Sequence, residues 1–323
     1  MSPAEFTLVP QAGQKKGLGH LRRMLSLADS ASSLGHKVLF ATNYLEDGLV
    51  EEVEAKFETL SLELKQKHHS DKQFLVLDGY EIPVDKFQEH RNLVIFEDFV
   101  HRNLKCKFLV DANVSKGSLS KYDHHSYQSL LEGESFIVLG PEYRKPAKIR
   151  DFVAKPRLLI SLGGSDPENF TDIVLQTITK HLENFSKVSV AIGPLNSNET
   201  ELKRKYSEYE IDWIRSPESL FDVYENHDVA IGAGGTSAYE RVNRNLPSVN
   251  LVTTDNQIRV SEGLASEGLA FSVNLSSGQQ LEISNISDLT NEASTRKARL
   301  RGHDYVDGYG SERLIVGILA ARD

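Results

Sequence analysis

Short apolar runs alternate with helical patterns along most of this 323-residue chain. In the first half, five such runs are rich in branched and aromatic residues, and they cover residues 6–9, 37–41, 74–78, 93–98 and 107–111. The second half repeats the pattern at residues 157–161, 188–193, 229–233 and 248–252. Continuous apolar strands separated by helices are typical of a parallel sheet that is covered on both faces. The sequence therefore predicts an α/β protein with two successive parallel sheets.

A polar, proline-bearing stretch without periodicity, residues 140–148, interrupts this pattern. It predicts a linker, with one domain over residues 1–145 and a second over residues 146–323. Two α/β domains in succession predict a ligand-binding cleft between them. Residues 311–321 form an apolar-faced helical pattern, and this last helix could pack back on the first domain.

The first glycine loop places a histidine at the start of a predicted helix. Gly17 and Gly19 come before His20, and apolar residues spaced three and four apart predict a helix over residues 21–34. Glycines at a helix N-terminus let backbone N–H groups approach an anion, which the helix dipole also favours. His20 would then be an acid–base group beside a phosphate or sugar. The alternative is a tight turn between strand and helix that binds no ligand.

Polar residues follow the predicted strands of the first half. Asp78, Tyr80, Asp98 and Asn113 would lie at the carboxyl ends of parallel strands, where such sheets bind their ligands. The alternative for each Asp or Asn is a cap on the next turn or helix. The sequence therefore predicts a polar site at this sheet edge without assigning the role of each residue.

A second group of candidates lies in the second half. Gly234 and Gly235 lead into a helix that begins with Thr236 and Ser237, and this turn can offer hydrogen-bond donors to a diphosphate. Glu240, one turn later, can accept both hydroxyls of a ribose. The alternative is an ordinary helix with Thr236 or Ser237 as its cap and Glu240 closing a capping box.

Two further segments could face the same ligand. Gly164 and Ser165 belong to another glycine turn after a predicted strand. Asn256 and Gln257 are adjacent amides that could bond to a sugar or a base. Otherwise the two amides are ordinary loop residues.

Composition excludes several classes of partner. The formal net charge of −9 argues against a nucleic-acid backbone as the main partner. No apolar run approaches the roughly 20 residues that span a bilayer, and no signal peptide is evident. The single cysteine, Cys106, excludes an intrachain disulfide and fits a reducing cytoplasm. We therefore expect a cytoplasmic protein without a membrane span, and the sequence predicts no particular oligomeric state.

Taken in order, these segments resemble the UDP-sugar hydrolases of pseudaminic acid biosynthesis, which act on UDP-2,4-diacetamido-2,4,6-trideoxy-β-L-altropyranose. The resemblance covers essentially the whole chain. It rests on residues 17–23 (GLGHLRR), 77–80 (LDGY), 97–98 (ED), 163–166 (GGSD), 232–240, 246–248 (LPS), 256–257 (NQ) and 306–310 (VDGYG).

The resemblance implies a fold and a mechanism. The fold would be the GT-B architecture of two Rossmann-like domains, related to the lipid II-forming N-acetylglucosaminyltransferase. His20 would be the general base that activates water, and UDP would leave. The residues facing the sugar would be Gly17, Gly19, Arg23, Tyr80, Asp98, Asn256 and Gln257. The nucleotide would contact Gly164, Ser165, Gly234, Gly235, Thr236, Ser237 and Glu240.

The departing charge of UDP could be stabilised by N–H donors and a helix dipole alone. The sequence has no Asp-X-Asp, no Cys/His metal-ligand spacing and no phosphate-binding Gly-Lys-Ser. We therefore expect no metal and no cofactor.

Two segments depart from the family pattern and keep other functions open. Gln11 stands in the loop where the family usually has an upstream Asp, and residues 139–143 lack the arginine of the family's linker signature. One alternative is a glycosyltransferase of the same architecture, in which His20 activates an acceptor hydroxyl instead of water. Another is a protein that binds a nucleotide sugar without catalysis.

Overall fold

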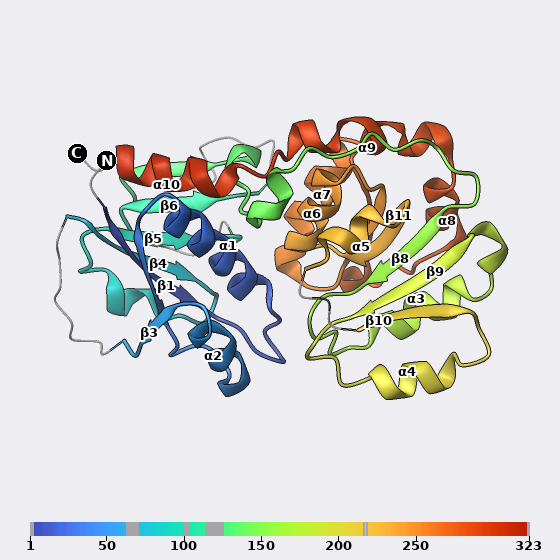
Figure 1. Ribbon diagram of the computed structural model, residues 1–323, viewed down its shortest axis with the longest axis horizontal. Helices are drawn as coiled ribbons and strands as arrows, with labels where there is room; N and C mark the ends of the chain where they lie inside the picture. The colour runs from blue at the N-terminus through green and yellow to red at the C-terminus, as the bar shows by residue number, and fades with distance from the viewer. Residues whose placement is uncertain are drawn as a thin grey trace. The chain divides into compact units, whose positions relative to one another are not determined.

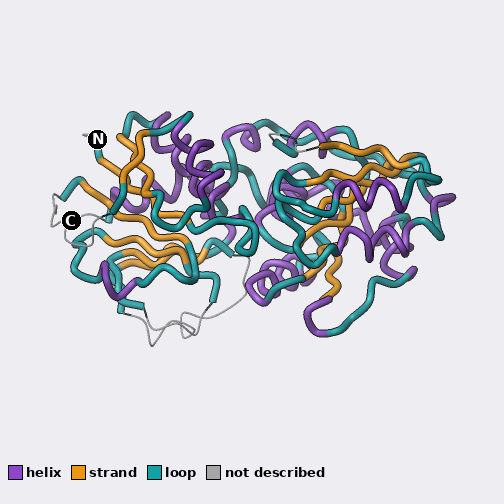
Figure 2. The backbone as a smooth tube through the Cα atoms, turned by 90° about the horizontal axis from the view of Figure 1, so that it is seen from below, coloured by secondary structure: helices purple, strands orange, loops and turns teal. Residues whose placement is uncertain are grey.

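The computed structural model describes residues 3–62, 71–99, 104–113, 126–215, 217 and 219–321. The chain divides into two compact units, one made of Met1–Arg144 with Gly308–Asp323 and the other of Lys145–Asp307. Figure 2 shows the strands of each sheet running side by side, with helices beside them.

The sheet of the first unit has the strand order β3-β2-β1-β4-β5-β6-β7, and its neighbours are parallel. The strands are β1 (Glu5–Pro10), β2 (Lys37–Ala41), β3 (Glu58–Leu60), β4 (Gln73–Asp78), β5 (Leu93–Phe96), β6 (Phe108–Asp111) and β7 (Ser129–Glu132). The order reverses at β1, which lies between β2 and β4. Open α/β sheets bind ligands beyond the carboxyl ends of the strands at such a reversal.

Helices from both ends of the sequence cover this sheet (Figure 1). They are α1 (Gly19–Ser33), α2 (Asp47–Glu54) and α10 (Gly310–Ala320), with the 3₁₀-helices η1 (Val84–Phe87), η3 (Glu134–Phe136) and η4 (Pro141–Arg144). α1 and α10 pack against each other. Both are amphipathic and bury their apolar faces, α10 through Leu314, Ile315, Ile318 and Leu319.

The segment predicted as a linker is folded in its first half. Residues 141–144 form η4, and Tyr143 is buried. Arg144 donates to Ser30 Oγ over 2.7 Å and pairs with Glu312 over 3.1 Å. These contacts hold the chain to α1 and α10 up to the last residue of the first unit.

The sheet of the second unit has the order β10-β9-β8-β11-β12-β13, again with parallel neighbours. Its strands are β8 (Arg157–Ser161), β9 (Lys187–Ile192), β10 (Ile211–Arg215), β11 (Val229–Ala233), β12 (Ser248–Val252) and β13 (Phe271–Asn274). The order reverses at β8. The buried apolar side chains of β8, β9, β11 and β12 form the centre of the core of this unit.

The helices of the second unit follow its strands in turn. They are α3 (Phe170–Ile178), α4 (Glu199–Lys205), α5 (Phe221–Glu225), α6 (Thr236–Asn243), α7 (Ile258–Ser266), α8 (Ile283–Leu289) and α9 (Glu292–Tyr305). The 3₁₀-helices are η5 (Leu182–Asn184), η6 (Asp255–Gln257) and η7 (Leu275–Ser277).

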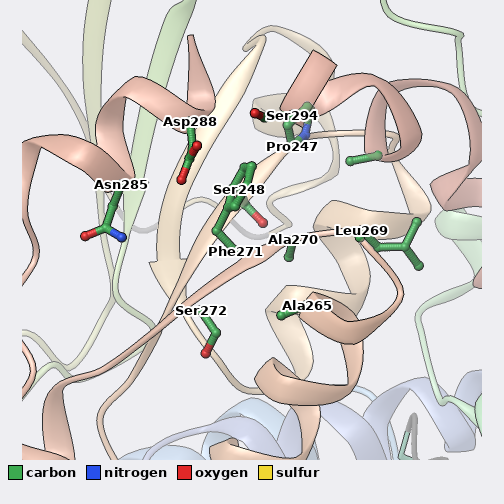
Figure 3. A pocket seen from close by; sticks show the side chains of 12 residues that line it. Pro247, Ser248, Ala265, Leu269, Ala270, Phe271, Ser272, Asn285, Asp288 and Ser294 are labelled. Atoms are coloured by element: carbon green, nitrogen blue, oxygen red, sulfur yellow. The ribbon is translucent and has the colours of Figure 1, made fainter. Parts of the chain in front are cut away.

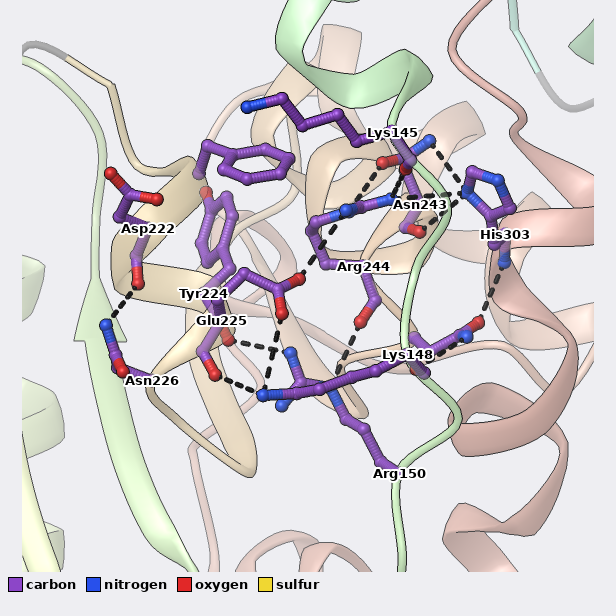
Figure 4. A network of polar contacts seen from close by, with 12 residues as sticks. Lys145, Lys148, Arg150, Asp222, Tyr224, Glu225, Asn226, Asn243, Arg244 and His303 are labelled. Atoms are coloured by element: carbon purple, nitrogen blue, oxygen red, sulfur yellow. Dashed lines mark hydrogen bonds and ion pairs between the residues drawn. The ribbon is translucent and has the colours of Figure 1, made fainter.

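Buried arginines fix the start of the second unit to its helices (Figure 4). Arg150 donates to the backbone oxygen of Tyr224 over 2.7 Å and to that of Arg244 over 3.0 Å. Arg244 in turn donates to the backbone oxygen of Lys145 over 2.5 Å. Arg150 therefore adds donors to carbonyl groups at the C-terminal ends of α5 and α6, where the helix itself supplies few partners.

The structure confirms the nine predicted strands and the helix after the first glycine loop. The sequence did not predict β3, β7, β10 and β13. Each of these four is an edge strand of its sheet, and most of their residues are half-buried or exposed.

Candidate active site

His20 is the second residue of α1, at the helix N-terminus that follows the first glycine loop. The loop closes on itself through backbone contacts between Gly13 and Gly17, whose φ is +74°. Its N-cap residue, Leu18, has no side chain that could cap the helix. His20 is only 8% exposed, so most of its imidazole is packed against protein.

Asp78 holds the imidazole of His20 in one orientation. It ends β4, in register with Pro10 at the end of β1, and its Oδ1 lies 2.8 Å from His20 Nδ1. Arg23 Nη2 lies 3.3 Å from the same ring nitrogen, which cannot donate to Asp78 and accept from Arg23 at once. The contact with the buried anion is the shorter one, so we assign the proton to Nδ1 and the lone pair to Nε2. Nε2 makes no hydrogen bond to any residue that the structure describes.

Arg23 lies one turn after His20 on α1 and bridges two carboxylates. Its Nε and Nη2 donate to the two oxygens of Asp78 over 2.8 and 2.5 Å. Its Nη1 and Nη2 donate to the two oxygens of Asp98 over 3.1 Å each. The guanidinium also lies over the ring of Phe96 at 4.9 Å. The resemblance placed Arg23 among the residues facing the sugar, and the structure places its guanidinium between carboxylates.

These contacts decide the charge of the cluster. Burial is the largest single influence and raises the pKa of Asp78 and of Asp98, but the charge of Arg23, together with the charge of His20 and the hydrogen bonds that the two carboxylates accept, holds both pKa values below the ordinary range of a carboxyl. Burial likewise opposes the charge of Arg23, but the two carboxylates raise its pKa. The cluster therefore contains two carboxylates and one guanidinium at neutral pH.

Tyr80 connects Asp98 to the imidazole. Its hydroxyl donates to Asp98 Oδ2 over 2.7 Å, and its ring meets the ring of His20 edge to face at 4.6 Å. Burial and the charge of Asp98 raise the pKa of Tyr80, so its hydroxyl remains a donor. Gln11 fixes the backbone here, because its Oε1 accepts from the N–H groups of Tyr80 and Glu81 over 2.9 and 3.2 Å.

The next strand adds an amide to the same edge. Asn113 Nδ2 donates to Asp98 Oδ1 over 3.2 Å and to Asp111 Oδ1 over 2.8 Å. The carboxyl ends of β1, β4, β5 and β6 thus contribute to one polar cluster at the point where the strand order reverses.

The structure therefore brings together four residues that the sequence proposed for the site, namely His20, Arg23, Tyr80 and Asp98. Asp78 was recognised only as a carboxylate at the sheet edge and as part of the LDGY motif. Its position at the end of a buried strand and the LDGY motif were the sequence signals that pointed to it.

In the second unit, the turn after β8 is tightly packed. Gly164 accepts a backbone hydrogen bond from Leu195, and Ser165 is 6% exposed. Asp166 caps α3, because its carboxylate accepts from the N–H groups of Phe170 and Thr171 over 2.8 and 3.0 Å. Gly164 and Ser165 thus lie on a fixed turn at the carboxyl end of β8.

The turn after β11 lies beside the predicted amide pair. A Cβ on Gly234 would lie 2.2 Å from Ser261 Oγ and 3.4 Å from Gln257 Cβ, so only glycine allows this approach. Gly235 is the N-cap of α6, and neither Thr236 nor Ser237 supplies a side-chain cap. The capping box that the sequence allowed as the alternative interpretation of this turn is therefore not present. The first N–H groups of α6 have no side-chain acceptor from that motif.

Glu240 and the two amides have partly defined partners. Glu240 Oε2 accepts a hydrogen bond of 3.0 Å from the hydroxyl of Tyr224. Gln257 Oε1 accepts from the N–H and hydroxyl of Thr253 over 3.0 and 3.2 Å, and Asn256 Oδ1 accepts from Thr254 over 2.6 Å. The amide oxygens are thus engaged within the loop, and the amide NH₂ groups make no hydrogen bond to the described residues.

A cavity of about 270 Å³ lies elsewhere in the second unit (Figure 3). It is lined by Ser248 and Phe271, the first residues of β12 and β13, with Asp288 of α8 beside them. This is the amino-terminal edge of the sheet, and none of the predicted site residues lines the cavity.

In the described part of the chain, no group of three His, Cys, Asp or Glu side chains has the arrangement of a metal site. No helix among those residues combines the length and apolarity needed to span a bilayer.

No protein-family model matches the chain. Among curated proteins, the uncharacterized protein MJ1062 of Methanocaldococcus jannaschii is 23% identical over 274 residues, which are 78% of this chain and 56% of that protein. The chain thus spans little more than half the length of that relative. The spore coat polysaccharide biosynthesis protein SpsG of Bacillus subtilis is 22% identical over 279 residues, which are 81% of each protein.

Solved structures establish the fold. MurG of Acinetobacter baumannii superimposes with a TM-score of 0.68 at 13% identity, over 98% of this chain and 99% of that one. HepE of Anabaena, determined in complex with UDP-glucose, superimposes with a TM-score of 0.61 at 9% identity, over 98% of this chain and 100% of that one. The prediction of fold class is confirmed: the chain has the two parallel-sheet, Rossmann-like units of the GT-B glycosyltransferases.

Proposed function

We propose that the chain is an enzyme that transfers a glycosyl group from a UDP-sugar, with His20 as the general base. The observation that carries this proposal is the hydrogen bond between Asp78 and His20 Nδ1, which leaves Nε2 as the proton acceptor. A base held in one orientation and tautomer by a buried carboxylate is a recurring catalytic arrangement.

The reaction follows from this geometry. Nε2 of His20 takes the proton of an attacking O–H group while that oxygen bonds to the anomeric carbon of the sugar. The bond from this carbon to UDP breaks, and its electron pair leaves with the diphosphate. Asp78 stabilises the imidazolium that forms, and Arg23 shares the negative charge of Asp78 and limits how strongly it does so.

The second unit would hold the nucleotide. The N–H groups at the start of α6, after Gly234 and Gly235, are suited to a diphosphate, and Glu240 to the hydroxyls of the ribose. The turn at Gly164 and Ser165 would add further donors. Among the remaining candidates, Gly17, Gly19, Tyr80, Asp98, Asn256 and Gln257 would contact the sugar.

The acceptor decides between transfer and hydrolysis. The GT-B fold is shared with glycosyltransferases, which favours an acceptor hydroxyl as the nucleophile. Hydrolysis is the second candidate, because residues 17–23 and 77–80 resemble motifs of UDP-sugar hydrolases. The name of SpsG places that relative in polysaccharide biosynthesis, which suits either reaction.

The first experiment measures UDP release from UDP-2,4-diacetamido-2,4,6-trideoxy-β-L-altropyranose and from common UDP-sugars. Each is incubated with and without added sugar acceptors. Release that requires an acceptor supports transfer, whereas release in buffer alone supports hydrolysis. UDP binding with no turnover under either condition would contradict the proposal and leave a binding protein.

The base is tested with His20→Ala, which should lose turnover by about 100-fold or more while its affinity for UDP stays unchanged. His36→Ala is the matched control. His36 lies in the same unit, and its Nδ1 accepts one hydrogen bond from the N–H of Ala4, at the amino end of β1. Turnover by His20→Ala at the rate of the control would overturn the assignment of the base.

A further inference from the structure

We propose that Tyr224 is a positioning residue that orients Glu240 toward the ribose hydroxyls of the nucleotide. This inference rests on the proposed function, in which the second unit binds a UDP-sugar. Tyr224 lies on α5 and is fully buried, and its hydroxyl donates to Glu240 Oε2 over 3.0 Å. It would not touch the ligand itself.

The backbone of Tyr224 is fixed from outside the site (Figure 4). Its carbonyl oxygen accepts a hydrogen bond of 2.7 Å from Arg150 Nη2, and Arg150 also donates to the backbone oxygen of His227. Arg299 of α9 donates to the carbonyl oxygen of Arg150 over 2.9 Å. α5 is therefore tied to the rest of the unit, so the Tyr224 hydroxyl has a defined position from which to hold a carboxylate.

The helix that carries Glu240 is fixed equally well. The next residue, Arg241, is fully buried and donates to the backbone oxygen of Ala233 and to Asn250 Oδ1 over 2.8 Å each. These contacts tie α6 to the end of β11 and to the middle of β12. Both partners of the Tyr224–Glu240 hydrogen bond thus stand on rigid elements, as a preorganised binding group requires.

The chemistry of the pair suits a ribose. A carboxylate has about four acceptor positions, and the hydrogen bond from Tyr224 uses one of those at Oε2 and fixes the plane of the group. Burial and the charge of Glu240 raise the pKa of Tyr224, which keeps its hydroxyl protonated and donating. A carboxylate held in this way favours ligands with vicinal hydroxyls over ligands that lack them. Tyr224 should therefore contribute to selectivity for ribonucleotides.

The test measures binding of UDP and of 2′,3′-dideoxy-UDP by titration calorimetry. Tyr224→Phe should weaken UDP binding about tenfold and dideoxy-UDP binding much less, so that the preference for UDP shrinks about tenfold. Tyr206→Phe is the matched control, because the Tyr206 hydroxyl donates to Asp172 Oδ1 over 2.7 Å in a similar pair outside the candidate site. It should leave both affinities unchanged.

Equal weakening of both ligands by Tyr224→Phe, or no weakening, would overturn the inference while the proposed function stands. Failure of the wild-type protein to bind UDP would overturn the proposed function and this inference with it. Should Tyr224→Phe not fold, Glu240→Asp withdraws the carboxylate from Tyr224 by one methylene and must show the same loss of selectivity.

Discussion

Replacing Asp78 by Asn should disable the proposed base without removing it. Asp78 accepts three hydrogen bonds, from His20 Nδ1 at Oδ1 and from Arg23 at both oxygens. In the isosteric Asn an NH₂ group must take the place of one oxygen. At Oδ2 it would oppose Arg23 Nε, and at Oδ1 it would oppose Arg23 Nη2 and force His20 Nδ1 to become an acceptor. In the first orientation, His20 loses its contact with a negatively charged group. In the second, the ring proton moves to Nε2, which then cannot accept a proton.

The expected loss follows from the contribution of a general base. Such a base accelerates a reaction by about 10²–10⁴-fold, so Asp78→Asn should lower kcat/KM by at least about 100-fold. This corresponds to about 2.7 kcal/mol or more of transition-state stabilisation. Arg23 keeps both hydrogen bonds to Asp98, so we expect the stability cost to be smaller than the about 3–5 kcal/mol of a fully broken buried ion pair.

The assay is release of UDP from whichever UDP-sugar supports turnover in the first experiment, with UDP affinity and thermal unfolding measured on the same samples. In a double-mutant cycle, adding Asp78→Asn to His20→Ala should cost almost nothing further, because the carboxylate acts through the imidazole. A kcat/KM of Asp78→Asn within threefold of wild type would refute the reasoning. So would a full additional 100-fold loss in the double variant.

Three further outcomes are expected. Gly308→Ala should lower the free energy of unfolding in urea by about 1–3 kcal/mol, since Gly308 has a φ of +81° and a Cβ there would lie 2.4 Å from a backbone oxygen. Gly278→Ala, with a φ of +86° and open space around it, should lose less, and an equal loss would argue against the close contact. Because Arg23 lowers the pKa of Asp98, the stability from this pair is present above the unfolded pKa of about 3.9 and is lost as the pH falls further. Asp98→Asn should therefore flatten the decline of the unfolding free energy below about pH 4, and an unchanged slope would contradict this. Burial raises the pKa of the Cys106 thiol to about 12, so a thiol reagent at mildly alkaline pH should label it in urea and hardly at all in the native protein.

The centre of each sheet could be predicted from the sequence, and its edges could not. A central strand is buried on both faces, so its apolar run is continuous and easily recognised, as in β4 and β11. An edge strand is covered less completely and shows a mixed pattern, as in β7 and β10. All four strands that the sequence did not predict belong to this second kind.

The candidate site was predictable in its parts and not in its contacts. The glycine loop indicated His20 as a candidate site residue. Asp78, however, lies 58 positions away, and no pattern in either segment indicates that the two side chains are in contact. Arg23 could be read as a ligand-facing residue of the helix until the structure showed it between two carboxylates. Side-chain direction at the end of a strand depends on packing between distant segments, which one sequence does not reveal.

The placement of α10 determines the order in which the units can be completed during translation. Its residues follow the whole of the second unit in the sequence, yet its apolar face, which includes Leu314 and Ile318, is packed with α1 in the first unit. A ribosome therefore releases everything that the unit Lys145–Asp307 needs before the first unit can be finished. Until α10 emerges, α1 presents to solvent the apolar surface that α10 later covers. The unit that is begun first in synthesis is thus also the unit whose last element is made last.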